Sequence, residues 1–425
     1  MRVALWFMAL FAIAAAGALF AGNNHATVTL YWHPHRVDLS LNLVLLGLLF
    51  TFVTLHLALR ALSALLSIPQ QARSWRLSQR ERSVYGSLLE SLSHLVSGRF
   101  VRARKSAELV VSLEESVQRS GEELPHAARL RTIAHLIAAE SAHALQDRAV
   151  REAHFVQALA EAERRDVVDA KEGVQLRGAR WAIDDRDASS SMQWLDQLPQ
   201  GAARRTVALR LRFRAARLAG MPRQALDTAR LLTKHRAFSA VAGASIARGL
   251  AIEMLRTAYD QVQIQTAWDA LSEEEKLMPD IALEAAQRLL DQGGDVQLAL
   301  SWILPLWAAM VRPTEGLGQP QRVRLVRILE QSFVAAQEPP DAAWLARIEN
   351  AQMSNPSDAL LQYIAGYVCM QLKLWGKAQQ MLSQCLPRLR DAALQRDAWR
   401  ALAHLAEQRQ DLQAASNAYR EAAKR

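Results

Sequence analysis

Hydrophobic residues fill two long stretches near the N-terminus of the chain and recur at helical spacing through the remainder. Residues 3–21 contain no charged side chain, and residues 41–59 contain no Asp, Glu, Lys or Arg. A helix of roughly 19 residues is about 28 Å long, which matches the hydrocarbon core of a bilayer. The pattern therefore predicts two transmembrane helices, at about 3–21 and 41–66. A cleaved signal peptide is the alternative for the first, because Ala16-Gly17-Ala18 fits a cleavage site.

A short polar segment, residues 22–40, separates the two apolar stretches. In this segment Val28, Leu30 and Trp32 alternate with Thr27, Thr29 and Tyr31, which predicts a small β-strand followed by a turn at His33-Pro34-His35. His25, His33 and His35 lie close together here, but no cysteine or carboxylate cluster accompanies them. We therefore predict no metal site in the segment.

The positive charges around the apolar stretches indicate a topology. Arg36, balanced by Asp38, is the only Lys or Arg of the segment between them, whereas four arginines follow the second stretch: Arg73, Arg76, Arg80 and Arg82. By the positive-inside rule, residues 22–40 lie in the periplasm and the chain from residue 67 onward lies in the cytoplasm. We therefore expect a multi-pass protein of the bacterial inner membrane, with a basic juxtamembrane linker at 67–84.

From residue 85 onward, apolar and small residues recur three and four positions apart, in segments that end at Gly, Pro or Asp turns. This pattern predicts degenerate helical repeats over residues 85–311. Residues 312–320 are rich in Pro and Gly and read as a loop. Further helices are predicted over residues 321–425, so the fold class is all-α: a two-span membrane hairpin followed by an α-solenoid.

The C-terminal region holds two copies of one helix–turn–helix pattern, at about 357–388 and 394–425, offset by 37 residues as from Gln362 to Trp399. The positions that should pack the pairs together are Gly366, Ala378 and Leu382 in the first copy, and Trp399, Leu402, Ala403, Ala415 and Tyr419 in the second. The small residues let paired helices approach, and the large ones fill the space between pairs. This spacing resembles the tetratricopeptide repeat.

The chain is basic, with a net charge of +9 and a pI near 9.9. We expect an anionic membrane surface rather than nucleic acid as the counterpart of this charge, because acidic residues interleave with the basic ones along the repeats. The two cysteines, Cys369 and Cys385, fall on small repeat positions that should be buried. Core packing is therefore their predicted role.

Catalytic signatures are missing from the sequence. It has no Gly-rich phosphate loop, no H-E-x-x-H or G-x-S-x-G motif, and no cysteine pair spaced for zinc, so we predict that the protein is not an enzyme and has no resident cofactor. Surface residues are the remaining candidates. Arg210, Arg214 and Arg217 are spaced to share one helix face, which could grip a carboxylate on a protein segment or a porphyrin propionate; a plain solvated face is the alternative.

Two further candidates, Tyr363 and Tyr367, are predicted to form an aromatic contact surface in the first C-terminal repeat. Together with the arginine face, they are the predicted partner-binding residues. The pattern leaves the oligomeric state open.

The chain as a whole resembles the HemY family of proteobacterial inner-membrane proteins. The likeness lies in the hairpin with Val28-Thr29-Leu30-Tyr31-Trp32, in Leu88-Leu89-Glu90 leading to Gly98-Arg99-Phe100, in Trp268-Asp269-Ala270-Leu271 followed by Pro279, Ala285, Leu289, Gly294 and Ala299, and in the C-terminal repeats. The resemblance implies a non-enzymatic scaffold or regulator of haem (porphyrin) biosynthesis that binds late-pathway enzymes. Two alternatives stay open: a general envelope-assembly adaptor, and a protein that binds haem or a porphyrin directly.

Overall fold

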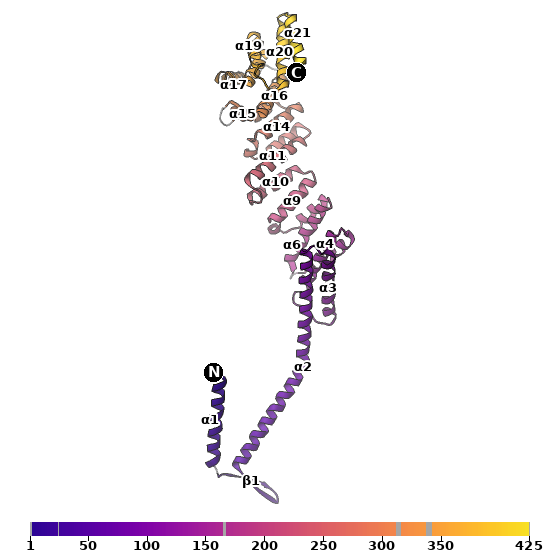
Figure 1. The fold of residues 1–425 in the computed structure, drawn as a ribbon, viewed down its shortest axis with the longest axis vertical. Helices are drawn as coiled ribbons and strands as arrows, with labels where there is room; N and C mark the ends of the chain where they lie inside the picture. Colours follow the sequence, from indigo (N-terminus) through magenta and orange to yellow (C-terminus); the bar gives the residue numbers. More distant parts are fainter. Residues whose placement is uncertain (1, 24, 165–166, 312–315, 337–341, 425) are drawn as a thin grey trace. The chain divides into compact units, whose positions relative to one another are not determined.

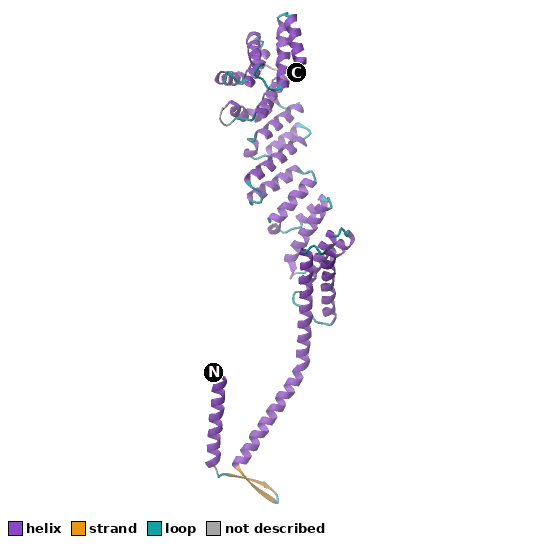
Figure 2. Cartoon of the chain, in the orientation of Figure 1, coloured by secondary structure: helices purple, strands orange, loops and turns teal. Residues whose placement is uncertain are grey.

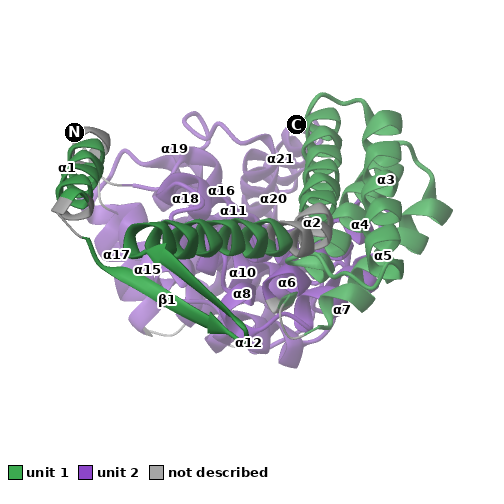
Figure 3. Ribbon diagram, turned by 90° about the horizontal axis from the view of Figure 1, so that it is seen from below, with its two compact units in different colours: residues 1–167 green, residues 168–425 purple. Residues whose placement is uncertain are grey.

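The computed structural model describes residues 2–23, 25–164, 167–311, 316–336 and 342–424, and these form two compact units, residues 1–167 and 168–425 (Figure 3). The first unit contains α1 (Arg2–Asn23), β1 (Thr27–Trp32), β2 (His35–Ser40), α2 (Leu41–Val96), α3 (Phe100–Arg119), α4 (Ala127–Ala144) and α5 (Arg148–Ala162). Apart from the single β-hairpin, the described elements are all helices, as Figure 2 shows by colour. The all-α expectation is therefore confirmed.

The segment between the two apolar helices is a two-stranded antiparallel hairpin (Figure 1). Thr27 pairs with Ser40 and Trp32 with His35, so the chain turns at His33-Pro34, within the predicted turn. We predicted β1 from the sequence but not β2, although Val37 and Leu39 alternate there with Arg36 and Asp38. Those two side chains form an ion pair of 3.2 Å on the surface of the hairpin.

The second apolar stretch begins a helix of 56 residues, α2. Ser40 caps its N-terminus, since the Ser40 hydroxyl accepts a hydrogen bond from the backbone N–H of Leu43 at 3.3 Å. By length and composition, residues 41–63 of this helix could cross a membrane, and their side chains are exposed. In α1 the described apolar run is the shorter Trp6–Leu19, so among the described residues one span of the predicted hairpin is supported.

Residues 67–84 continue α2 without a break in the backbone helix, so the stretch predicted as a linker is helical. The side chain of Arg73 lies outside the described part of the chain. Farther along α2, Val84 and Leu88 are buried against Ala107 and Val110 of α3. The same helix therefore carries the apolar stretch and builds the core of the first helical pair.

The helices α3, α4 and α5 pack on one another in chain order. Arg131 of α4 is buried between them and donates to Glu114 of α3 at 2.7 Å and to Glu161 of α5 at 3.1 Å. A buried charge needs such partners, because an unpaired one would lose its hydration without compensation. The two ion pairs of Arg131 therefore link α4 to both α3 and α5.

The second unit is a succession of helix pairs: α6 (Val168–Asp184), α7 (Ala188–Asp196), α8 (Gln200–Ala203), α9 (Thr206–Leu218), α10 (Pro222–Lys234), α11 (Ala240–Arg256), α12 (Gln261–Asp269), α13 (Glu273–Lys276), α14 (Pro279–Asp291), α15 (Val296–Val311), α16 (Gln319–Ala335), α17 (Ala342–Ser354), α18 (Ala359–Gln371), α19 (Trp375–Cys385), α20 (Ala392–Gln408) and α21 (Leu412–Ala423). Each helix packs on at least one chain neighbour, and α9, α11, α14, α16, α18 and α20 also contact the first helix of an adjacent pair. This double contact is the packing expected of a solenoid.

One hydrophobic core runs through most of the second unit, from α9 to α20. Large aromatic residues join consecutive pairs within it; for example, the rings of Trp268 and Trp302 stack with centroids 4.6 Å apart. Several connections between paired helices are short turns in which one residue has a positive φ, such as Gly220 at 65°. The tight turns let each second helix fold directly back on the first.

Candidate partner-binding surface

The three arginines of α9 lie on one exposed face of the helix. Arg210, Arg214 and Arg217 are exposed, whereas Leu209 and Ala216 on the opposite face are buried. Arg217 forms an ion pair of 3.3 Å with Glu253 of α11, and Arg210 and Arg214 form no ion pair with any residue that the structure describes. Two of the three guanidinium groups therefore point to solvent with their donors available.

A ladder of cross-helix ion pairs continues along the first helices beyond α11. Glu284 of α14 accepts from Arg256 of α11 at 2.7 Å and from Arg324 of α16 at 2.6 Å. Burial alone would raise the pKa of Glu284, but the two arginine hydrogen bonds hold that pKa below its ordinary value. The Glu284 carboxylate is thus ionised at neutral pH and joins three consecutive repeats.

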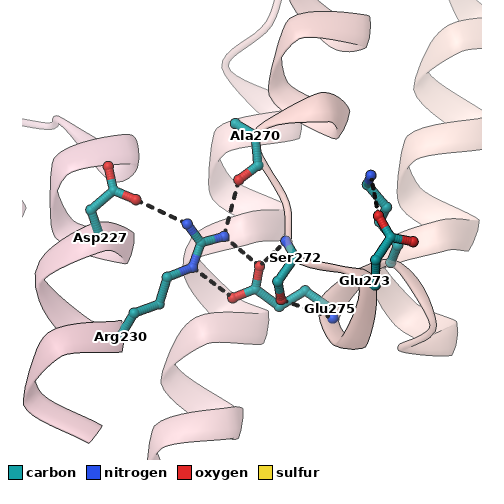
Figure 4. A network of polar contacts seen from close by, with 7 residues as sticks. Asp227, Arg230, Ala270, Ser272, Glu273 and Glu275 are labelled. Atoms are coloured by element: carbon teal, nitrogen blue, oxygen red, sulfur yellow. Dashed lines mark hydrogen bonds and ion pairs between the residues drawn. The ribbon is translucent and has the colours of Figure 1, made fainter. Parts of the chain in front are cut away.

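A second polar network closes the turn between α12 and α13 (Figure 4). Arg230 of α10 makes a bidentate contact with Glu275, with distances of 3.1 Å from Nε and 2.5 Å from Nη2, and also donates to the carbonyl oxygen of Ala270 at 3.1 Å. Glu275 in turn forms a capping box with Ser272. The network holds α13 against α10, which lies 45 residues earlier in the chain, and its role is structural.

The expectation of an aromatic contact surface is wrong, because Tyr363 and Tyr367 lie in the core. Their side chains are 1% and 8% exposed, and their rings stack on each other at 6.5 Å. The hydroxyl of Tyr363 donates to Glu330 of α16 at 3.0 Å. Helix α18 contacts α16, α17, α19 and α20, so almost every side chain from Leu360 to Cys369 is buried.

In the first C-terminal repeat, the small residue Gly366 marks a close approach of two helices. A Cβ atom added to Gly366 would lie 2.9 Å from Cγ of Leu382 and 3.2 Å from Cβ of Met381, both in α19. Ala378 and Leu382 are fully buried beside it. Glycine is therefore required for the distance between α18 and α19.

The second copy is buried to a lesser degree. Ala403 and Ala415 are buried between α20 and α21, whereas Trp399 and Leu402 are half-buried and Tyr419 is 43% exposed. Within the described chain no further helix packs on the outer side of α21. Trp399, Leu402 and Tyr419, the large residues predicted to pack between pairs, are consequently partly exposed to solvent.

The cysteines are free and buried, at Cys369 in α18 and Cys385 in α19. Burial raises the pKa of both thiols, that of Cys385 to about 12. Neither is a thiolate at neutral pH, so neither is suited to nucleophilic attack or metal binding. Elsewhere in the described ranges, no group of three or more His, Cys, Asp or Glu side chains is placed to hold a metal ion.

A local sequence pattern does not predict the ion-pair ladder, because its partners lie 28 to 40 residues apart in the chain. One signal was available: Glu284 interrupts the apolar run Ile281-Ala282-Leu283-Glu284-Ala285-Ala286. A carboxylate within such a run must be paired once the helix is buried on that side. A charged residue inside a run of small and apolar residues therefore indicates an ion pair with a neighbouring repeat.

A comparison with protein families matches the N-terminal part of the chain. Residues 26–146, which span the β-hairpin and helices α2 to α4, match a family model described as HemY protein N-terminus. The match confirms the resemblance to the HemY family. No curated protein matches the sequence.

Solved structures similar to the chain include one TPR domain. The P58(IPK) TPR domain is 15% identical and covers 77% of this chain and 99% of its own, with a TM-score of 0.23. The APC/C hetero-tetramer Cut9-Hcn1 (14% identity; 79% of this chain, 65% of that chain; TM-score 0.28) and Naa15/Naa10 bound to HypK-THB (12%; 77% and 57%; 0.24) are similar at the same level. With TM-scores this low, the helix arrangement rests on the chain's own structure.

Proposed function

We propose that the protein, whose residues 26–146 match the HemY protein N-terminus, is a non-enzymatic, membrane-anchored scaffold or regulator of haem biosynthesis. In this proposal the helical pairs bind late-pathway enzymes and hold them at the inner membrane. The family match carries the proposal, since a single match covers both the apolar part of α2 and the first helices that pack on it. The haem pathway itself comes from the family resemblance alone.

The membrane attachment in this proposal uses α2, whose residues 41–63 are apolar and exposed. The arginines Arg76, Arg80 and Arg82 follow on the same helix, and by the positive-inside rule they belong on the cytoplasmic side. Arg80 also donates to the Ser120 hydroxyl at the end of α3 at 2.9 Å. A second span at α1 and a cytoplasmic location for the helical pairs complete the proposed topology.

The partner-binding role is supported by exposed, unpaired basic groups on the helical pairs. Arg210 and Arg214 offer planar donors that suit carboxylates on a partner. An ion pair between an arginine and a carboxylate becomes stronger when a bound partner excludes water from it. An ion pair on an open surface stays hydrated and contributes little. We therefore place one partner contact on the α9 face.

Crosslinking in cells tests the proposal. A photo-crosslinking residue replaces Arg214 on the α9 face, and the control variant carries it at Val262, an exposed position of α12. We expect late haem-pathway enzymes to be captured from the Arg214 position in excess over the Val262 position, and porphyrin intermediates to accumulate when the gene is deleted. Capture of envelope-assembly proteins instead, with unchanged porphyrin levels, would contradict the proposal.

A further inference from the structure

A cleft opens beside the start of α16, where the segment between α19 and α20 passes close to it. The cleft has a volume of about 460 Å³ and is lined by Gln319, Pro320, Val323, Arg324, Arg327, Arg390 and Asp391. A neighbouring hollow of about 290 Å³ shares Gln319 and Arg390 with it and adds Arg322 and Arg388. We call these two hollows together the α16 cleft. Residues up to 72 positions apart in the sequence thus meet at one basic surface.

The α16 cleft has a net positive charge, because five arginines line it beside two aspartates, Asp358 and Asp391, and a third carboxylate, Glu284, pairs with one of the five, Arg324. Arg322 pairs with Asp358, and Arg327 pairs with Asp391 at 2.7 Å. Both aspartates also accept backbone N–H groups at helix starts, Asp358 from Leu360 at 3.0 Å and Asp391 from Leu394 at 2.9 Å. Much of the negative charge of the two aspartates is consequently already neutralised by partners within the fold.

Arg324 is already paired with Glu284, so Arg388 and Arg390 are the arginines that retain donors for a ligand. Arg390 is exposed and forms no ion pair with any described residue, although it lines both hollows. Arg388 has one hydrogen bond, from Nη1 to the carbonyl oxygen of Ser357 at a long 3.4 Å. Arg388 and Arg390 are both exposed, so a ligand in the cleft can reach their free donors.

The walls indicate the kind of ligand. Pro320 and Val323 place apolar surface beside the guanidinium groups, and Asp358 and Asp391 interrupt the basic lining. A nucleic-acid backbone would require a continuous basic track along its phosphates. A peptide with carboxylates on either side of an apolar residue matches both the charges and the apolar wall.

We propose that the α16 cleft binds an acidic peptide segment of a partner protein, with its carboxylates on Arg390 and Arg388 and an apolar side chain against Pro320 and Val323. This rests on the proposed function in one respect, since the segment belongs to a protein that the helical pairs hold. The chemistry of the cleft does not depend on which pathway the partner serves.

Fluorescence anisotropy on the full-length protein in detergent micelles tests the proposal. The probes are a fluorescein-labelled peptide of alternating Glu, Asp and Leu residues, its Gln/Asn/Leu counterpart and a single-stranded oligonucleotide of similar length. We expect saturable binding of the acidic peptide, weakened about tenfold by Arg390→Glu, since a charge-assisted contact becomes a repulsion. Arg390→Glu should not disturb the fold, because Arg390 is exposed and unpaired.

The matched control is Arg223→Glu, which makes the same charge reversal at an exposed arginine of α10 that forms no ion pair with any described residue, and it should leave peptide binding within twofold. Equal binding of the neutral peptide, or equal losses in the cleft variant and the control, would overturn the proposal. The proposal would also be overturned if the oligonucleotide bound more tightly than the acidic peptide and Arg390→Glu abolished that binding. Peptide binding at the cleft together with crosslinked partners outside haem synthesis would instead overturn the proposed pathway and leave the cleft assignment standing.

Discussion

The hydroxyl oxygen of Tyr363 lies 3.0 Å from Oε1 of Glu330, and this hydrogen bond joins α18 to α16. Burial is the main cause that raises the pKa of Glu330, to about 7, with a further contribution from Asp397; the Tyr363 bond and Arg327 act in the opposite direction. The carboxyl group is therefore poised to change charge near neutrality. A residue that was expected to contact partners thus contacts a titrating group of the core.

Glu330→Gln should alter the pH dependence of stability. A raised pKa in the folded state means that Glu330 contributes stability below its unfolded pKa near 4.5, and that this contribution is lost as pH rises through about 7. We expect the Gln variant to lose less unfolding free energy than the wild type between pH 4.5 and 8, with a difference on the order of 3 kcal/mol. Urea unfolding at a series of pH values measures it, and parallel curves for the two proteins would refute the assignment.

His135 should give a pH dependence of the opposite sign. Its Nδ1 lies 3.0 Å from Nδ1 of His154, and burial, then the charge of His154, lower the pKa of His135 to about 4. Glu161 and Glu115 act against this shift, and Arg131 reinforces it.

A lowered histidine pKa stabilises the fold above the unfolded pKa near 6.5, and that stability is lost as pH falls toward 4. His135→Gln should therefore flatten the acid limb of the stability profile. Amide hydrogen exchange in α4 and α5 between pH 7 and 4.5, corrected for intrinsic rates, reports the change. A variant that loses protection on acidification as steeply as the wild type would contradict the role of His135.

Glu275→Ala should weaken the contact between α10 and α13. The carboxylate of Glu275 is 7% exposed and Arg230 is 32% exposed, so removing the acid strands a partly buried guanidinium group (Figure 4). We expect a loss of about 2–4 kcal/mol of unfolding free energy, measured by chemical denaturation. Glu253→Ala removes the exposed pair with Arg217 and serves as control, with a change of about 0–1 kcal/mol. Similar losses in both variants would mean that burial of the pair is unimportant.

Gly366→Ala should destabilise the first C-terminal repeat by about 1–3 kcal/mol, because the new methyl group overlaps Leu382 and Met381. Gly249→Ala in the middle of α11 is the matched control, since a Cβ there meets nothing within 4 Å. Helix propensity alone should make that variant more stable by about 0.5–1 kcal/mol. Thermal denaturation followed by circular dichroism would show opposite shifts; shifts of the same sign would show that α18 and α19 can separate freely.

Local pattern was enough to predict the helices, the hairpin turn and the shared face of Arg210, Arg214 and Arg217. Each of these depends on residues a few positions apart, where helical or strand geometry leaves little choice. Tyr363 was wrongly predicted to be exposed, because an argument from residue spacing assumes that each helix has one solvent-exposed face. Helix α18 is covered by four other helices, and only tertiary contacts reveal that.

The ion pairs could not be predicted from local pattern either, because their partners are far apart in the sequence. Arg230 and Glu275 lie 45 residues apart, and Arg327 and Asp391 lie 64 apart. Repeats of unequal length bring such residues together at offsets that no single period predicts. The α16 cleft is therefore a product of how the C-terminal pairs stack, and its arginines carry no distinctive motif in the sequence.

The unbroken helix α2 has a mechanical consequence. It runs from the apolar residues 41–63 to Val84 and Leu88, which are buried against α3. A helix rises about 1.5 Å per residue, so the stretch between the apolar segment and that core is about 30 Å long. If residues 41–63 cross the bilayer, the helical backbone of α2 sets the distance between the lipid surface and the core that α2 forms with α3. A partner bound by α3 to α5 would then be held at that distance, whereas a flexible linker would let the distance vary.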